Sequence, residues 1–327
     1  MALVAILFGW TGAEARPVRV ATWNVELGIG TPGSAKYEAQ KDILRRVNAD
    51  IVAFQELGAP SSNEWVRLAG ELGYPYRAWG RMGFFAGDLV VGYFSRFPIV
   101  EVRSVESPPG AQEMTRLPMR IAVRVPGAAR TFTLWTVHLK AEFKLRDCFR
   151  RAVESSRVFQ DLAAYRKRFP DRTEYIVLGD MNDDPARSAQ PVEFTKAHPE
   201  VPFAYRLGKD IGFPLRYRAF PGDRFGEAGL AQVEAWQTGS RDPITHRLTN
   251  LRLDYIFVSP AVRNSASGAP RAEVYCSEGD APDAGMPKGG EFLAAGRSQE
   301  ASDHYPVFAD LHLEDAPPLP AVSSASK

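Results

Sequence analysis

The sequence contains few cysteines and no excess of charge of either sign, and each absence excludes a class of protein. Cys148 and Cys276 are the only cysteines among 327 residues, and no Cys/His spacing is that of a structural zinc site. The two thiols either form one disulfide that closes a long loop or stay separately buried, and the sequence leaves both open. The net charge of +1 and the isoelectric point of 7.8 differ from those of a strongly basic nucleic-acid-binding domain, for which a pI above about 9 is expected.

A hydrophobic run long enough to span a membrane is also missing. The apolar run at residues 2–10 is far shorter than the roughly 20 residues that a membrane-spanning helix needs. Ala13-Glu14-Ala15 follows this run and fits the small-x-small pattern of a signal-peptide cleavage site, although no basic segment precedes the run. We therefore predict a signal peptide at residues 1–15, a mature start at Arg16, and a secreted or periplasmic protein. The alternative is an N-terminal segment that is retained, either packed or disordered.

No Gly/Ser-rich linker and no internal repeat divides the chain. The content of 45% hydrophobic and 24% charged residues is that of an ordinary globular protein. Length alone suggests two domains of about 150 residues each, but polar motifs spread along the whole chain have to converge on one site. We therefore predict one domain at residues 16–314 and a Pro/Ser/Ala-rich tail at residues 315–327 that is expected to be disordered.

Six strand-like runs of the sequence carry polar side chains at or near one end. A polar group at the mouth of an apolar strand is costly unless it binds something. Asp180 and Asn182 are two residues apart and share one face of an extended chain, and an Asp next to a His, as in Asp303-His304, can orient the imidazole of a general acid or base. One such residue alone is most often a turn or cap residue, but six matched runs together predict a hydrolytic site. The residues are Asn24, Glu56, His138, Asp180 with Asn182, Asp254, and Asp303 with His304.

The order of these motifs resembles that of the endonuclease/exonuclease/phosphatase superfamily, which includes pancreatic-type deoxyribonucleases, abasic-site endonucleases, inositol polyphosphate 5-phosphatases and bacterial sphingomyelinases. The resemblance spans nearly the whole chain and implies an α/β fold, a four-layer α/β-β/α sandwich of two packed mixed β-sheets flanked by helices, with the site at one end of the sheet pair. The matching motifs are Trp23-Asn24, Gln55-Glu56, His138-Leu139, Gly179-Asp180-Met181-Asn182, Asp254-Tyr255 and Ser302-Asp303-His304.

Hydrophobic periodicity predicts many strands and few long helices. Helices are expected at residues 36–48, 61–72 and about 147–169, the second with Ser61 and Glu64 as a capping box. Strands are expected near residues 17–25, 50–56, 74–79, 87–95, 98–106, 118–125, 131–138, 174–180, 253–259 and 304–313.

Carboxylate and amide oxygens outnumber nitrogens among the polar residues, which favours Mg²⁺ or Mn²⁺ over zinc. A divalent ion would neutralise charge on the non-bridging oxygens of a phosphate ester. Glu26 lies two residues after Asn24, faces the same side of the chain, and is expected to join the metal shell. The predicted metal ligands are Glu56 as the main anchor, Asn24, Glu26 and Asp303.

The resemblance implies catalytic roles for the remaining polar residues. His304, paired with Asp303, activates water or protonates, and His138 contacts the phosphate or is a second acid or base. Asp180 is a base or an orienting group, and which group is the base stays open. Asp254 is expected either to orient a catalytic histidine or to help hold a metal ion.

Substrate contacts are expected from amides and from basic residues. By resemblance, Asn24 and Asn182 hold phosphate oxygens. Lys140, two residues after His138, is placed to reach a substrate phosphate; it lies in a segment, residues 138–157, with six basic and three acidic residues, a net of +3. That segment is otherwise a solvated helix face. Arg216, Arg218 and Arg224 belong either to a substrate loop or to the surface, and His198, His246 and His312 are expected to be ordinary surface or core residues.

The sequence thus predicts a secreted, divalent-metal-dependent phosphoesterase, a phosphodiesterase or endonuclease that hydrolyses P–O bonds in a phosphate-ester substrate, DNA or RNA included. We expect a monomer. One alternative is a small-molecule or phospholipid phosphatase or phosphodiesterase of the same superfamily, and another is a non-catalytic binding protein on this fold. Abasic-site endonucleases carry a tyrosine-bearing segment where this chain has His138, which disfavours a role in DNA repair.

Overall fold

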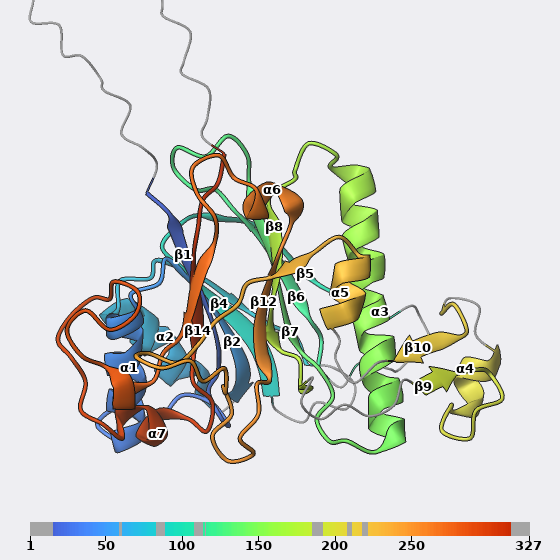
Figure 1. Ribbon diagram of the computed structural model, residues 1–327, viewed down its shortest axis with the longest axis horizontal. Coiled ribbons are helices and arrows are strands. Elements are labelled where there is room, and N and C mark those ends of the chain that lie inside the picture. Colours follow the sequence, from blue (N-terminus) through green and yellow to red (C-terminus); the bar gives the residue numbers. More distant parts are fainter. Residues whose placement is uncertain are drawn as a thin grey trace, which may run out of the picture.

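Two six-stranded β-sheets pack face to face, and helices cover the outer face of each sheet (Figure 1). The computed structural model describes residues 16–58, 61–82, 89–107, 114, 116–184, 192–207, 211–217 and 222–314. The predicted signal peptide at residues 1–15, the tail at residues 315–327 and Arg218 lie outside these residues. The layers confirm the predicted α/β-β/α sandwich.

The first sheet has the strand order β13-β14-β1-β2-β4-β3. β1 and β2 run parallel, whereas the other neighbours run antiparallel. The strands are β1 (Val18–Asn24), β2 (Ile51–Gly58), β3 (Tyr76–Trp79), β4 (Leu89–Ser95), β13 (Arg271–Val274) and β14 (Val307–Leu311).

The second sheet has the order β11-β12-β8-β7-β6-β5, with β7 and β8 parallel. Every strand predicted from the sequence is present, within a few residues at each end, and the two-residue β11 and the four-residue β13 are additions. The strands are β5 (Ile99–Ser104), β6 (Met119–Val123), β7 (Phe132–His138), β8 (Tyr175–Asp180), β11 (Ala231–Gln232) and β12 (Asp254–Val258).

Alternation along each strand divides its side chains between two cores. In β1, Val20 faces the second sheet, whereas Trp23 packs beneath the helices on the outer face. In β8, Leu178 lies between the sheets and Val177 lies under the long helix on the other side. Because both faces of each sheet are covered, these strands are almost continuously apolar, and for that reason they can be recognised in the sequence. Polar side chains are therefore confined to the strand ends.

The helices flank the two sheets on opposite sides (Figure 1). α1 (Ala35–Val47) begins after Ser34, whose side chain accepts a hydrogen bond from the Tyr37 main-chain N–H, and ends at Asn48 in the left-handed region. α2 (Ser62–Glu71) and α7 (Arg297–Ala301) lie on the same side, and α3 (Leu145–Arg168) and α5 (Gly222–Glu227) cover the second sheet. The predicted capping box of α2 is wrong, because the Ser61 hydroxyl donates to the Gly58 carbonyl and accepts from the Ile29 N–H instead.

A small two-stranded sheet lies outside the sandwich, beside α3 (Figure 1). It consists of β9 (Val192–Phe194) and β10 (Leu215–Tyr217), with α4 (Phe203–Leu207) between them. Phe194, Leu215 and Tyr217 pack against Phe149 of α3 in a separate hydrophobic cluster. The sequence did not predict this unit, because three-residue strands are too short to show a period of two.

The two cysteines are both buried and both free. Cys148 belongs to the cluster between α3 and the small sheet, and Cys276 belongs to the core between the two large sheets. Of the two possibilities left open by the sequence, the structure therefore has separate thiols. α6 (Pro260–Arg263) and a short 3₁₀ turn (Ser277–Gly279) complete the elements. Among the described helices, none has both the length and the apolar character needed to cross a bilayer.

Candidate active site

Strand ends from both sheets meet at the end of the sandwich where β1, β7 and β8 finish and β12 begins (Figure 1). β7 and β8 are parallel, and their register pairs His138 with Asp180. β8 and β12 are antiparallel, and their register pairs Asp180 with Asp254. Three of the predicted residues therefore stand side by side on adjacent strands. β1 brings Asn24 to the same end, opposite them, with its side chain 3.0 Å from Asp180.

His304 lies between two buried carboxylates. Its Nδ1 is 2.7 Å from Asp254 Oδ2, and its Nε2 is 3.8 Å from Asp180 Oδ2. The expected pairing of His304 with Asp303 is therefore wrong. An oxygen of Asp303 lies within 4.8 Å of a His304 ring nitrogen, so Asp303 acts on the imidazole through its charge, whereas Asp254 makes the hydrogen bond to Nδ1. Asp254 contacts a histidine, one of the two roles considered for it, and it also belongs to a group of side chains that could hold a metal ion.

The two carboxylates set the charge of the imidazole. Burial alone would lower the pKa of His304, but the charge and hydrogen bond of Asp254, with smaller contributions from Asp180 and Asp303, outweigh it and raise that pKa to about 10. Burial, followed by the charge of Asp254, raises the pKa of Asp180 to about 7. The ring is thus a cation at neutral pH, beside a carboxylate that titrates near neutrality.

Asn24 holds two acidic side chains in place. Its Nδ2 donates to Asp180 Oδ2 at 3.0 Å and to Glu56 Oε1 at 3.2 Å, and its Oδ1 accepts from the Glu26 N–H at 3.0 Å. Asn182 has a left-handed backbone (φ 50°), donates from Nδ2 to the Leu139 carbonyl, and uses its N–H to bind the other oxygen of Asp180. Both amides therefore orient the groups around Asp180 in this structure.

His138 is buried and uncharged. Burial, and then the positive charges of Arg116, His304 and Lys140, hold the pKa of His138 well below its usual range. Its Nε2 lies 3.5 Å from Asp180 Oδ2 and 3.7 Å from Glu56 Oε1. Its Nδ1 is buried with no hydrogen-bond partner among the residues that the structure describes. A neutral imidazole beside two carboxylates is suited to hydrogen bonding rather than to charge neutralisation.

Three carboxylates surround one ammonium group at the edge of the site. The Nζ of Lys36, in the first turn of α1, donates to the Glu26 carbonyl oxygen, and Glu26, Asp303 and Glu56 all act on its charge. Burial nevertheless lowers the pKa of Lys36. The Asp303 main-chain N–H binds Glu26 Oε2 at 3.1 Å. Oxygen donors that attract a cation in this way fit a hard divalent ion.

Two groups of described side chains place their ligand atoms within 4.8 Å of one another: His246, Asp303 and His304, and Asp180, Asp254 and His304. Asp303, a predicted ligand, belongs to the first group, and Asp254, for which holding a metal ion was one of two expected roles, belongs to the second. Glu26 and Glu56 instead bind main-chain N–H groups at 3.1 and 3.2 Å. His304 belongs to both groups, so the possible metal sites among the described residues adjoin this imidazole.

Two residues of the site had no recognisable signal in the sequence. His246 lies in an irregular segment and reaches Asp303, with its Nε2 3.4 Å from Oδ2, and its ring is 4.5 Å from the ring of His304. Lys36 resembles any lysine on an exposed helix. Neither position follows from periodicity, because both depend on contacts between distant segments.

Of the predicted basic contacts that the structure describes, Lys140 acts on His138 through its charge, whereas Arg216 and Arg224 contact other parts of the molecule. The Lys140 ammonium donates to the Ala141 carbonyl at 2.8 Å and lies 3.6 Å from Asp147. Arg216 is exposed and pairs with Glu193 on the small sheet, and Arg224 binds the Ala152 carbonyl of α3. The last two are therefore parts of the surface around α3 rather than of a substrate loop at the catalytic end.

A buried polar cluster connects the small sheet to the strand end that carries Asp180. The Tyr217 hydroxyl of β10 donates to Asp183, and Arg151 of α3 donates to that hydroxyl at 2.9 Å. Burial raises the pKa of Asp183 to about 6. The cluster fixes the chain just after Asn182.

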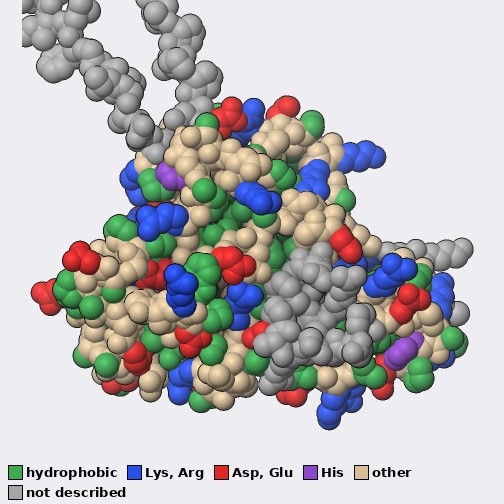
Figure 2. Space-filling view, viewed as in Figure 1, with side chains coloured by type: hydrophobic (Ala, Val, Ile, Leu, Met, Phe, Trp, Pro, Cys, Tyr) green, Lys and Arg blue, Asp and Glu red, His purple; other side chains and the backbone are tan. Residues whose placement is uncertain are grey.

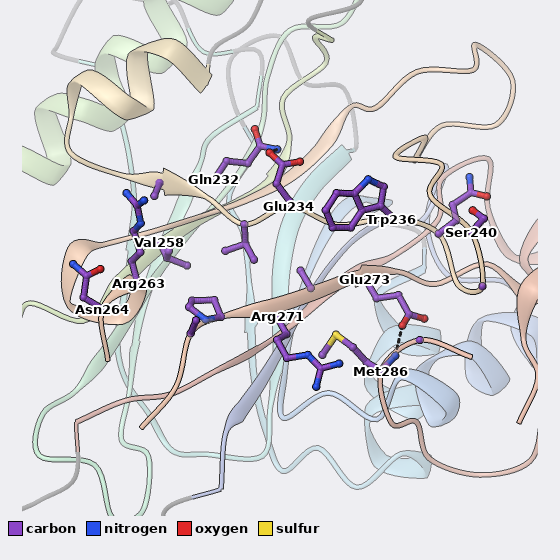
Figure 3. A pocket seen from close by; sticks show the side chains of 18 residues that line it. Gln232, Glu234, Trp236, Ser240, Val258, Arg263, Asn264, Arg271, Glu273 and Met286 are labelled. Carbon is purple, nitrogen blue, oxygen red and sulfur yellow. Dashed lines mark hydrogen bonds between the residues drawn. The ribbon is translucent and has the colours of Figure 1, made fainter. Parts of the chain in front are cut away.

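A cavity of about 720 Å³ lies elsewhere, in a groove between the edge strands β11 and β13. Gln232, Glu234 and Trp236 line one side and Arg271 the other, and Glu273 accepts a hydrogen bond from the Met286 N–H (Figure 3). None of the predicted site residues lines this groove. The titratable groups that shift one another's pKa values, Asp180, His304 and His138, lie at the strand ends. We therefore place the candidate active site there.

Comparison with known proteins supports the fold. The sequence model of the Endonuclease/Exonuclease/phosphatase family matches residues 21–304. None of the curated proteins matches the sequence.

Among solved structures, an endonuclease/exonuclease/phosphatase from Beutenbergia cavernae is similar with a TM-score of 0.58 and 18% identity, over 93% of this chain and 73% of that one. The human Nocturnin catalytic domain with bound sulfate has a TM-score of 0.55 and 15% identity, and the match covers 92% of this chain and 96% of that one. Sphingomyelinase C from Streptomyces griseocarneus has a TM-score of 0.52 and 15% identity, and the match covers 90% of this chain and 99% of that one. At these identities the likeness shows the fold.

Proposed function

This chain belongs to the endonuclease/exonuclease/phosphatase family, and on that premise we propose that it is a divalent-metal-dependent phosphodiesterase that hydrolyses P–O bonds by attack of water. The observation that carries the proposal is the buried row of Asp254, His304 and Asp180, in which one imidazole lies between two carboxylates. Buried, interacting titratable groups whose pKa values are strongly shifted, as those of Asp180 and His304 are, are typical of acid–base sites.

Asp180 is the base in this proposal. Its raised pKa, about 7, makes the carboxylate more basic than an exposed one while leaving much of it ionised at neutral pH. Asn24 and the Asn182 N–H bind its two oxygens and so fix its orientation. A water beside Asp180 loses its proton to this carboxylate as its oxygen attacks phosphorus.

His304 and His138 contact the phosphoryl group in different charge states. Asp254 keeps His304 protonated, so the imidazolium stabilises the negative charge on a non-bridging oxygen in the transition state. His138 stays neutral and offers its Nε2, which lies between Asp180 and Glu56. When bound, a Mg²⁺ or Mn²⁺ ion held by Glu26, Glu56 and Asp303 would neutralise charge on the phosphoryl and leaving oxygens.

The substrate class is proposed at two levels. Phosphodiesters, DNA and RNA among them, are the first candidate, because His138 together with Asp303-His304 resembles the deoxyribonuclease arrangement. A small-molecule or phospholipid ester is the second candidate, because the Lys140 ammonium is already engaged near Asp147 and because basic and acidic side chains are interspersed over the face shown in Figure 2. A polynucleotide would need several phosphate contacts.

The proposal is tested with purified protein and plasmid DNA, RNA, bis-p-nitrophenyl phosphate and sphingomyelin, with Mg²⁺ or Mn²⁺ and with chelator. We expect metal-dependent hydrolysis of at least one ester, and its loss in Asp180→Asn. Nuclease activity should weaken steeply between low and physiological salt, whereas hydrolysis of the small diester should hardly change. Hydrolysis that continues in excess chelator, or in Asp180→Asn, would contradict the proposal.

Export and a monomeric state are further parts of the proposal, supported by the composition of residues 1–15 and by the fold, which buries its core within one chain. Expression of the full chain in a bacterial host, followed by N-terminal sequencing of the exported protein, tests the first. A mature start at or near Arg16 is expected. Light scattering of the purified protein tests the second.

A further inference from the structure

His246 is held against the active site by its main chain. The Tyr305 N–H donates to the Thr245 carbonyl at 2.7 Å, and the Arg247 N–H donates to the Asp303 carbonyl at 3.0 Å. These two bonds pair the segment around His246 antiparallel with the segment around His304. The backbone position of His246 beside His304 is therefore set by main-chain pairing.

The ring of His246 contacts two groups of the site. Its Nε2 is 3.4 Å from Asp303 Oδ2. Its ring packs edge-to-face against that of His304, with 4.5 Å between centroids and 68° between planes. His246 thus touches the carboxylate that the proposed metal centre requires and the imidazole that the proposed mechanism requires.

Hydrogen bonds at the other ring nitrogen determine which nitrogen carries the proton. The Thr249 main-chain N–H donates to His246 Nδ1 at 3.2 Å, and the Thr249 hydroxyl lies 2.6 Å from the same nitrogen. A main-chain N–H can only donate, so Nδ1 is the acceptor. The proton of the neutral ring is then on Nε2, the nitrogen that faces Asp303.

We propose that His246 is a positioning residue of the metal centre, whose Nε2–H orients the Asp303 carboxylate for the divalent cation. The inference rests on the proposed function. His246 is not itself a ligand in this arrangement, because its free electron pair is on Nδ1 and faces Thr249. Groups that hold a ligating carboxylate in place typically contribute about 10- to 100-fold to metal affinity.

Two amide substitutions separate the roles of the two nitrogens. In His246→Gln the side-chain amide reaches the position of Nε2 and can donate to Asp303, whereas in His246→Asn it reaches only the position of Nδ1. His246→Phe keeps the ring against His304 without any donor. The control is His198→Asn, since His198 Nδ1 also accepts from a nearby main-chain N–H, that of Glu200 at 3.2 Å, but lies in the loop between β9 and α4, outside the sandwich.

The measurement is the dissociation constant of Mn²⁺ and of Mg²⁺ for the full chain, by calorimetry, with thermal unfolding in chelator as a check that each variant is folded. We expect both ions to bind about 10-fold more weakly or worse to His246→Asn and His246→Phe, and within about threefold of the parent for His246→Gln and His198→Asn. Restored affinity in the Gln variant is a result that a purely structural role would not produce.

Three results would overturn the inference, and they are distinguishable. Equal affinity of the parent and His246→Asn would remove the positioning role and leave the proposed function intact. Loss of Mn²⁺ affinity with unchanged Mg²⁺ affinity would mean that His246 is a direct nitrogen ligand. A parent that binds neither ion would contradict the proposed function together with this inference.

Discussion

Replacing Asp254 with Asn tests which carboxylate supports His304. The Asp254 side chain is buried, and its Oδ2 lies 2.7 Å from His304 Nδ1. The substitution keeps the shape of the side chain and removes its charge. Because Asp254 is the largest influence that raises the pKa of His304, the buried imidazole of the variant should be mostly neutral at neutral pH. The main-chain bond from Asp254 to the Thr245 hydroxyl remains, so the fold should survive.

The expected loss in kcat is about 10²- to 10⁴-fold, the range for a positioned acid or base whose orienting carboxylate is removed. This corresponds to about 3 to 5 kcal/mol of activation free energy. The pH dependence should also change. His304 acts while protonated, so on the alkaline side the activity of the parent should not fall until the pH approaches the raised pKa of about 10. In Asp254→Asn that fall should begin at lower pH.

The assay is steady-state hydrolysis of a phosphodiester at several Mn²⁺ concentrations, for Asp254→Asn and Asp303→Asn in parallel. Asp254→Asn should lose kcat at every metal concentration, whereas Asp303→Asn should need more metal and recover part of its activity when the ion is saturating. The reasoning would be refuted if the two variants exchanged these behaviours, since Asp303 would then be the partner of His304 in the working enzyme.

Four further outcomes are expected. Glu56→Gln should abolish hydrolysis, as chelator does in the parent, and full activity of the parent in excess EDTA would exclude a metal requirement. His138→Ala should lower kcat about 10²-fold or more while circular dichroism stays unchanged; melting with full activity per folded molecule would make His138 a core residue. Burial raises the pKa of Asp183 from 3.8 to about 6, so this group destabilises the folded protein as the pH rises through that window. Relative to the parent, the free energy of unfolding of Asp183→Asn should rise by up to about 3 kcal/mol between pH 4 and pH 7 in urea titrations. If the difference in unfolding free energy between variant and parent were the same at both pH values, the pKa of Asp183 would not be raised. Unfolded protein should react with two equivalents of a thiol reagent without reductant, since Cys148 and Cys276 are free; no reaction would indicate a disulfide.

Most of the strands could be predicted because both faces of each are covered. A strand buried on two sides is apolar nearly throughout, and a polar residue at its end is then conspicuous, as Asp180 is after Tyr175–Leu178. The small sheet of β9 and β10 could not be predicted, since a three-residue strand has no measurable period. The capping box at Ser61 failed for a different reason: two main-chain groups elsewhere compete for the same hydroxyl.

The partner of His304 shows the limit of reasoning from neighbouring residues. Asp303 is adjacent in sequence, but Asp254, 50 residues away, is the carboxylate that is hydrogen-bonded to the imidazole. That contact follows from the register of β12 on β8, which sets Asp254 opposite Asp180. His246 reaches Asp303 only because its segment pairs with the chain around His304.

The sequence by itself determined most of the strands, their polar ends, and the oxygen and imidazole groups found there, because hydrophobic period and residue type are local properties; the layers followed from the resemblance to a known family. The tertiary structure decided which of these groups touch, which nitrogen of His246 carries the proton, and whether the two thiols meet. Those relations depend on strand register and on the packing of one sheet over the other. Both are properties of segments far apart in the chain, and no local pattern records them.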